Sequence, residues 1–375
     1  MNFPPDQDLE QLRYHLALAM APKVGPTLFK AIVAYSGSPK DFFKLTKGKA
    51  SKIPRVGEKL LEIQKNESNL LRTADDIQNT CQKKGLDIHF SSSSKFPHRL
   101  KTIEDSPVIL FSQGKGELNF DRSIGIVGTR SATNYGKAIT KKIIEDLLPY
   151  RPVIISGLAY GIDIEAHRAA LQVGLPTIAI MGSPIDQIYP AAHKKTAEQL
   201  QETGLLISEY APGSRMVPGN FPARNRIIAG LSDALIVVEA AEKGGALITA
   251  EIAYSYDKDV FAVPGNLLST YSEGCNQLIR KMKASIYTGP GDIAEALFWT
   301  KPGEEKIKKP TLDLSGRDEE ERSILLHLQE KVESEIDLIS YATEIPLGIL
   351  SSKLLSLEFE GIVKSLPGKK FKLMI

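Results

Sequence analysis

The chain has 375 residues, of which 42% are hydrophobic and 25% are charged, and its formal net charge is +2. This length predicts two or three domains, and the small net charge excludes a globally basic nucleic-acid binder, so any such site must be a local patch. Two distant cysteines, Cys81 and Cys275, match no metal-ligand spacing, and no stretch is long and apolar enough to cross a bilayer. We therefore expect a cytoplasmic protein with reduced thiols and no membrane contact.

Residues 1–75 are predicted to form short helices that contain a weak internal repeat. Its copies, 22–28 and 54–60, each give a hydrophobic residue, a glycine and then an amphipathic helix. They look like a pair of helix-hairpin-helix motifs, in which the glycine permits a tight turn whose amides can face a phosphate. We expect a small helical domain of the helix-hairpin-helix or SAM-like kind, followed by a connector over 76–106. DNA contact and simple packing are equally open roles for this domain.

From about residue 107 to 298, apolar strands alternate with amphipathic helices. Strands are predicted at 108–111, 124–127, 153–156, 177–181, 205–208, 234–238 and 260–263, and helices notably at 135–148, 162–172, 192–202 and 247–256. This alternation indicates an α/β domain built on a Rossmann-like, doubly wound parallel sheet. Ligands of such sheets bind beyond the carboxyl ends of the strands, so the loops that follow the strands should gather at that edge.

The last part of the chain is predicted to be a separate module. Mixed charge, glycine and prolines make 299–316 a linker. Helical patterns at 319–331, 335–341 and 347–360, with a β-hairpin that turns at Pro367 and Gly368, then predict a winged helix over 317–375.

The charge of this module argues against a winged-helix transcription factor. There are 11 acidic and 4 basic residues from Arg317 to Glu360, and the candidate recognition helix offers only Lys353. A DNA-reading helix normally presents basic or amide side chains to the bases. We expect protein contact here, with at most weak DNA-backbone contact through the lysines of the wing.

The segment 219–230 is the most informative part of the sequence. It places Phe221, Arg224, Asn225 and Arg226 within six residues and contains no acidic residue. Arginine offers a rigid fork of donors to phosphate, and a phenyl face stacks on any base. The segment also opens a helix, whose free amides add partial positive charge toward an anion. We predict that these four residues bind DNA, and the alternative is an ordinary surface helix with solvated arginines.

Three glycine-bearing loops follow predicted strands and could hold phosphate. The first contains Gly128, Thr129 and Arg130, the second contains Ser156 and Gly157, and the third contains Lys243, Gly244 and Gly245. Arg130 can pair with a phosphate at the exit of its strand, and the amides of the second loop can form a nest for an anion. In the third loop, Lys243 and the glycine pair can approach a backbone phosphate.

No cofactor, metal or catalytic set is expected. The first loop is not Gly-x-Gly-x-x-Gly, and no acidic residue ends the strand 153–156, so a dinucleotide is not predicted. Asp163 is expected to stabilise the start of its helix, His167 to pack or cap, and His193 to lie in a loop without an evident partner. No Ser–His–Asp set, metal cluster or paired-carboxylate motif is recognised.

An enzymatic alternative comes from the third loop. Nucleotide-processing Rossmann proteins of the lysine-decarboxylase-like group, which include phosphoribohydrolases, carry Pro-Gly-Gly-x-Gly-Thr-x-x-Glu. This chain keeps Gly244 and Gly245 but has Lys243 in place of the proline, Ile248 in place of the later glycine, and a shifted glutamate, Glu251. A nucleotide-binding role of this kind is the alternative to DNA binding.

These motifs together closely resemble the DNA processing protein A family. The resemblance is carried by residues 125–130, 156–163, 221–228 and 243–250, and is extended by 263–265 and 274–279. It implies a protein that is not an enzyme, binds single-stranded DNA taken up during natural transformation, and loads the RecA recombinase on it. It also implies a homodimer formed through the Rossmann domain.

Overall fold

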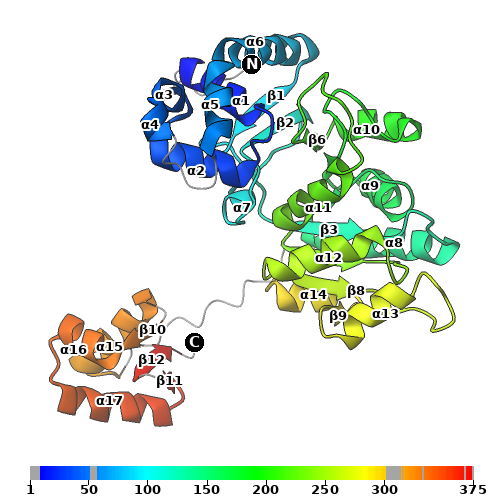
Figure 1. Cartoon of the computed structure of the whole chain (residues 1–375). Coiled ribbons are helices and arrows are strands. Elements are labelled where there is room, and N and C mark those ends of the chain that lie inside the picture. Colours follow the sequence, from blue (N-terminus) through cyan, green and yellow to red (C-terminus); the bar gives the residue numbers. More distant parts are fainter. Residues whose placement is uncertain are drawn as a thin grey trace. The chain divides into compact units, whose positions relative to one another are not determined.

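The computed structural model describes residues 9–50, 57–300, 314, 316–331, 333–366 and 369–373. Contacts divide the chain into two compact units, Met1–Trp299 and Thr300–Ile375. Over the described residues, the larger unit contains a nine-stranded sheet with N-terminal helices, and the smaller unit contains helices and a three-stranded sheet (Figure 1). The predicted α/β class is therefore confirmed.

The large sheet has the strand order β1-β2-β6-β5-β4-β3-β7-β8-β9. The run from β6 to β9 in this order is parallel, whereas β2 is antiparallel to both of its neighbours, β1 and β6. The strands are β1 Asp87–Phe90, β2 Ile109–Gly114, β3 Ser123–Val127, β4 Val153–Ser156, β5 Thr177–Met181, β6 Leu205–Ser208, β7 Ala234–Val237, β8 Asp259–Ala262 and β9 Ser285–Ile286.

Each strand predicted from the sequence is present, but the sheet is not wholly parallel. Strand β2, expected to be part of the parallel sheet, pairs in the antiparallel sense and joins β1 to the sheet. The sequence pattern missed β1, whose residues are mostly only half-buried, and β9, which has two exposed residues. Neither strand has the continuous apolar run that marks a buried strand.

Helices cover both faces of the parallel part of the sheet. Residues that alternate along one strand pack on opposite sides: Ile124 and Ile126 belong to one core, and Val127 belongs to the other. The first core lies under α8 (Asn134–Leu147), α9 (Ile162–Val173) and α14 (Pro290–Ala296). The second lies under α11 (Asn220–Leu231), α12 (Gly245–Ser255) and α13 (Glu273–Arg280). Helix α10 (Lys194–Leu200) joins β5 to β6.

The N-terminal helices share a core with the sheet. Leu16, Phe29 and Ile77 pack in the same cluster as Phe111 of β2 and Leu206 of β6. The helices are α1 Leu9–Ala19, α2 Pro26–Ser36, α3 Pro39–Lys44, α4 Lys47–Ala50, α5 Gly57–Lys65, α6 Glu67–Lys84 and α7 His98–Lys101. The predicted boundary at residue 75 lies inside α6, and the predicted connector contains part of α6, β1 and α7. The structure therefore differs from the division into an independent 1–75 domain and a connector.

Only one copy of the predicted N-terminal repeat can be compared with the structure. In the first copy, Gly25 lies at the N-cap of α2 and Pro26 begins that helix. In the second copy, residues 54–56 lie outside the described residues, and α5 begins at Gly57. The prediction of paired hairpins therefore stays a prediction.

The smaller unit has its own core, in which Ile324, Leu328, Ile339, Leu350 and Leu354 are fully or almost fully buried. Its elements are α15 Glu319–Lys331, β10 Glu333–Glu335, α16 Ile336–Thr343, α17 Leu347–Phe359, β11 Val363–Leu366 and β12 Lys370–Leu373. The strands form an antiparallel sheet in the order β10-β12-β11. The predicted hairpin is present, although its turn at 367–368 lies outside the described residues, and β10 is an addition to the prediction.

Among the helices that the structure describes, none combines the length and the apolar character needed to cross a lipid bilayer.

Candidate nucleic-acid interface

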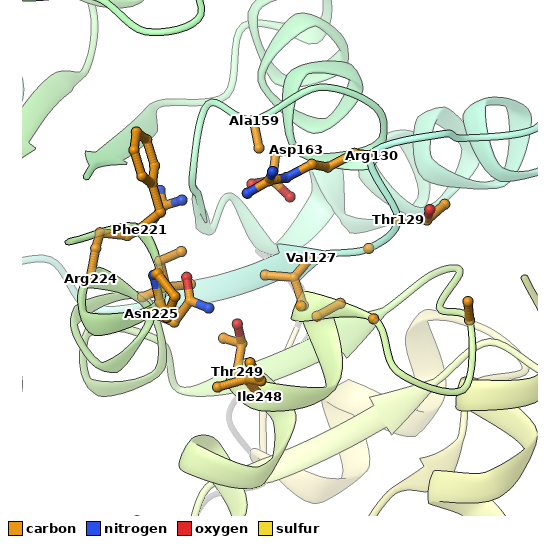
Figure 2. Close-up of a pocket in the computed structure, with 17 residues that line it drawn as sticks. Val127, Thr129, Arg130, Ala159, Asp163, Phe221, Arg224, Asn225, Ile248 and Thr249 are labelled. Atoms are coloured by element: carbon orange, nitrogen blue, oxygen red, sulfur yellow. The ribbon is translucent and has the colours of Figure 1, made fainter. Parts of the chain in front are cut away.

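The connectivity of the sheet creates a crevice at the carboxyl ends of β3 and β7. After β3 the chain builds β4, β5 and β6 on one side, and it then returns to build β7, β8 and β9 on the other. The loops that leave β3 and β7 therefore diverge, which is where doubly wound sheets bind ligands. A cavity of about 410 Å³ lies at this point. Figure 2 shows side chains from the β3 exit, the start of α9, α11 and α12 arranged around it.

Arg130 supplies positive charge to the wall of this cavity. Its side chain is exposed, and no carboxylate pairs with it among the residues that the structure describes. The start of α12 lies across the cavity, where Gly244 is the N-cap and Gly245 and Ala246 also line the wall. Amides at a helix start carry partial positive charge and attract anions. Lys243 is exposed one residue earlier but does not line the cavity.

Phe221 and Asn225 enter the cavity from α11. The half-buried ring of Phe221 packs against Tyr189, with ring centroids 5.3 Å apart. Tyr189 belongs to the loop after β5, and half of its surface is exposed. A partly exposed aromatic pair is a surface on which flat bases can stack.

Arg224, predicted to contact phosphate, is buried instead. It is only 4% exposed, and its guanidinium donates hydrogen bonds to the carbonyls of Gly157 (2.6 Å) and Ile180. Burial lowers the pKa of Arg224 to about 10, although the nearby charge of Asp163 acts in the opposite direction. The guanidinium thus joins α11 to the loop after β4 and to β5. This corrects the interpretation of Arg224 as a solvent-facing phosphate ligand.

Arg226 is engaged in a similar way. Its Nη2 atom lies 2.5–2.6 Å from both carboxylate oxygens of Glu209, and only 12% of its side chain is exposed. Glu209 follows β6, so it lies near in space but outside the acid-free segment 219–230. The structure therefore corrects the expectation that Arg226 faces DNA, because its charge is already neutralised by an internal partner.

The second predicted phosphate loop surrounds an internal carboxyl group, that of Asp163. Ser156 and Gly157 are buried, and the Ser156 hydroxyl donates to the carbonyl of Ile126 at 2.6 Å. Burial raises the pKa of Asp163, while the nearby charge of Arg224 and the backbone amides of Ala159 and Gly157 favour its charged form. The predicted nest thus surrounds the carboxyl group of Asp163, and the roles of Ser156 and Gly157 are structural. This agrees with the structural role expected for Asp163.

Two of the predicted glycines allow close packing of the loops. A Cβ atom on Gly128 would lie 2.4 Å from a side-chain carbon of Ile162, and one on Gly157 would lie 2.2 Å from the guanidinium of Arg224. Thr129 next to Gly128 donates its amide to the carbonyl of Glu239 at 2.6 Å, which joins the β3 and β7 exits. The position of Arg130 is therefore fixed by backbone contacts on both sides of the crevice.

The histidines near the crevice are structural. His167 is buried and contacts Thr177 at 2.7 Å, as expected for a packing residue. His193, expected to lack a partner, is buried, lies 2.8 Å from the carbonyl oxygen of Leu158 and packs edge-on against Tyr160, so that expectation was wrong. In the described ranges, no group of three His, Cys, Asp or Glu side chains is placed to hold a metal ion.

Sequence reasoning missed Tyr189 and Thr249. Tyr189 lies 32 residues before Phe221, and its proximity depends on neighbouring strands. Thr249 lines the cavity one helical turn after Gly245, a spacing that the glycine pair could have indicated.

Comparison with known proteins assigns the family. The model of the DNA recombination-mediator protein A family matches residues 87–298, which is more than half of the chain. The chain is 32% identical to the protein Smf of Synechocystis over 96% of this chain and 98% of that protein. The chain belongs to the DNA recombination-mediator protein A family. Within this family, it is 42% identical to the DNA processing protein DprA of Streptococcus pneumoniae over 54% of this chain and 72% of that protein.

A solved structure supports the same assignment. The X-ray structure of DNA processing protein A from Streptococcus pneumoniae matches with a TM-score of 0.62 and 32% identity, and it covers 77% of this chain and 98% of that one. The family match begins at residue 87, the first residue of β1, rather than at the predicted 107. The matched region therefore includes the antiparallel edge of the sheet as well as the cavity.

Proposed function

We propose that the chain binds single-stranded DNA at the cavity between the β3 and β7 exits. The observation that carries this proposal is the exposed guanidinium of Arg130, which has no ion-pair partner in the described part of the chain and lies on the same cavity as Phe221 and Asn225. The Asp163 carboxylate also lines this cavity, but it is buried against Arg224 and the amides of its own loop. The accessible charge on the cavity wall is therefore the positive charge of Arg130, which attracts an anion.

The chemistry of the cavity favours binding of a DNA strand without discrimination between bases. Phosphate contacts from Arg130 and the start of α12 position a strand and carry no sequence information. An aromatic ring such as Phe221 stacks on any base, because every base has a π-face. Asn225 is the amide side chain that lines this cavity from α11. We infer binding with little base preference.

The nucleotide-hydrolase alternative has less support. The shifted glutamate of the third loop, Glu251, pairs with Lys283 at 2.6 Å and does not line the cavity. The glycine pair Gly244–Gly245 then serves as an open helix start for phosphate rather than as part of a catalytic set. This favours a protein that holds DNA without chemical change.

We further infer that the bound strand is passed to a RecA-type recombinase and that the chain acts as a homodimer. Family membership in the recombination mediators supports the first inference, and the resemblance described above supports the second. The finer domain assignments, a helix-hairpin-helix-like N-terminal part and a winged helix at the C-terminus, belong to the same proposal.

The small unit is proposed to contact proteins rather than read DNA. Lys353, the lysine of α17, is ion-paired with Asp318 and lies 3.7 Å from Glu320 and 3.9 Å from Glu321. Its charge is therefore neutralised within the unit. The α15–α17 arrangement with a small antiparallel sheet agrees with a winged helix whose recognition helix has no free cation in its described part.

A competition experiment tests the proposal. The full chain is titrated with a labelled single strand, and unlabelled single strand, duplex of the same sequence and a mononucleotide compete at equal nucleotide concentration. Single strand should compete best, with little difference between homopolymers. Preference for duplex would support the winged-helix transcription factor, and tight mononucleotide binding with turnover would support the nucleotide hydrolase. Either result would overturn this proposal.

A further inference from the structure

A second hollow lies beside the cavity, on the other side of Phe221. It has a volume of about 420 Å³ and is lined by Arg130, Tyr189, Met216, Pro218, Phe221 and Pro222. This volume falls in the range of small-molecule sites, roughly 300–1,000 Å³. The hollow and the cavity share Arg130, Phe221 and Pro222, so they are adjacent compartments with a common wall.

The lining of the hollow suits a flat aromatic group. It presents the rings of Tyr189 and Phe221, the thioether of Met216 and two proline rings, and no carboxylate lines it. Aromatic rings stack on bases, and a thioether makes favourable contacts with aromatic rings. Tyr189 is half exposed, so its ring is available to a ligand while it also packs on Phe221.

The shared cation sets the relation between the two compartments. Arg130 lines both hollows, and successive bases of a strand are joined by one phosphate. A guanidinium between two base-sized compartments is placed to contact that linking phosphate, because its donor fork matches phosphate oxygens. The hollow is thus suited to the nucleotide next to the one in the cavity, on the same strand.

We propose that the hollow lined by Tyr189, Met216 and Pro218 is a second base site, which takes an unstacked base of the same single strand while Arg130 holds the phosphate between the two nucleotides. This inference rests on the proposed function and adds to it a two-nucleotide footprint centred on Phe221. Tyr189 is its main stacking surface.

The test compares two strands of equal length, a homothymidine strand and a fully abasic strand with the same backbone, in binding to the full chain. Tyr189→Ala should weaken binding of the homothymidine strand by about 5- to 150-fold, the range expected for loss of one stacked base. It should leave binding of the abasic strand unchanged, because that strand has no base to stack. Tyr189→Phe should retain the affinity.

Tyr160→Ala is the matched control. Tyr160 is 49% exposed, as Tyr189 is 50% exposed, and lies in the loop after β4, but it lines neither compartment. Its removal should change neither affinity. Met216→Ala provides a second variant from another segment, with a smaller loss expected on the homothymidine strand alone. Thermal unfolding of each variant checks that the fold is kept.

The outcomes separate this inference from the proposed function. If Arg130→Ala and Phe221→Ala weaken binding while Tyr189→Ala behaves like Tyr160→Ala, the second base site is wrong and the proposed function stands. Equal losses on the thymidine and abasic strands for Tyr189→Ala would also overturn the base site. If none of the three substitutions weakens single-strand binding, the proposed function itself fails.

Discussion

Arg224 is a buried part of the cavity wall and donates hydrogen bonds to the carbonyls of Gly157 and Ile180, whereas Arg130 is exposed on the wall of the same cavity. Replacement of a buried arginine leaves the carbonyls that accepted its hydrogen bonds without partners and removes the positive charge near a buried carboxyl group. Replacement of an exposed arginine removes only its contacts with ligand. The two side chains should therefore respond differently to the same substitution. Stability measurements separate the roles of the two residues.

Arg224→Met should lower the free energy of unfolding by about 3–5 kcal/mol, because it leaves Asp163 buried without its neighbouring cation. Arg130→Met should change it by no more than about 0.5 kcal/mol, as is usual for exposed positions. Denaturant unfolding followed by Trp299 fluorescence measures both, since this single tryptophan packs near Tyr150 in the larger unit. An Arg224 variant as stable as the parent but weaker in DNA binding would restore the original phosphate-ligand prediction.

Phe221→Ala should weaken binding of single strands by about 1–3 kcal/mol, because one base loses its stacking surface. The dependence of affinity on salt should hardly change, since no phosphate contact is removed. Fluorescence anisotropy at several salt concentrations gives both quantities. If the substitution lowers the melting temperature and leaves affinity intact, the ring serves only to pack against Tyr189 and Gly182.

At the scale of elements, strand β2 joins the N-terminal helices to the parallel sheet. Its residues Ile109 and Phe111 are buried in the cluster that contains α1, α2 and α6, and β2 also pairs with β1. A fragment that begins at residue 107 would expose that cluster and one edge of β2. Exposed apolar surface and an unpaired strand edge favour aggregation.

We expect residues 107–298 to be less stable and less soluble than residues 1–299, with residues 87–298, which keep β1, in between. The three fragments are compared by circular dichroism melting and by size-exclusion chromatography. A fragment 107–298 that melts at the temperature of 1–299 would show that the shared core contributes little, and it would support the domain boundaries predicted from sequence.

The sequence predicted elements better than contacts between them. Strands such as β5 and helices such as α15 are marked by local apolar patterns, so they were predicted with little error. Arg224 and Arg226 are turned away from ligand by internal partners, which lie in or directly after strands β4, β5 and β6. No local sequence pattern identifies such partners. Arg130 was predictable as a cavity residue because the exit of the first parallel strand lies beside the switch point.

At the scale of the whole molecule, two buried histidines, His15 and His167, and the half-buried His89 make the free energy of unfolding depend on pH. Burial lowers the pKa of His15 and of His89 to about 4 and that of His167 to about 3. Because these values lie below the ordinary value of 6.5, the unfolded state binds protons first. The resulting stability is complete above about pH 6.5 and is lost progressively as the pH falls toward 4.

His15→Asn should reduce the loss of unfolding free energy between pH 6.5 and 4 by about 3 kcal/mol, because an amide does not titrate. Each variant is referred to its own stability at neutral pH, since Asn also changes packing between Phe29 and Phe90. His98→Gln, at an exposed position, is the control. If the parent and His15→Asn lose the same unfolding free energy between pH 6.5 and 4, the His15 side chain is charged in the folded protein over this range.

Removal of residues 300–375 should leave single-strand affinity within about twofold, because the two units have separate cores and Lys353 is already ion-paired. A gel-shift comparison of residues 1–299 with the full chain measures this. A large loss of single-strand affinity would place part of the DNA site in the smaller unit. Loss confined to binding of a protein partner would agree with the role proposed for that unit.

The proposed DNA binding depends above all on Arg130, which is expected to contact a phosphate at the crevice between β3 and β7. The most direct test is to compare how the affinity for single-stranded DNA depends on salt in the full chain and in Arg130→Ala. Plots of log affinity against log salt should be linear for both proteins, and the slope of the variant should be less negative by about 0.7, the value for one phosphate of a single strand. The variant should also bind all homopolymers more weakly by a similar factor. An unchanged slope together with unchanged affinity would contradict the account.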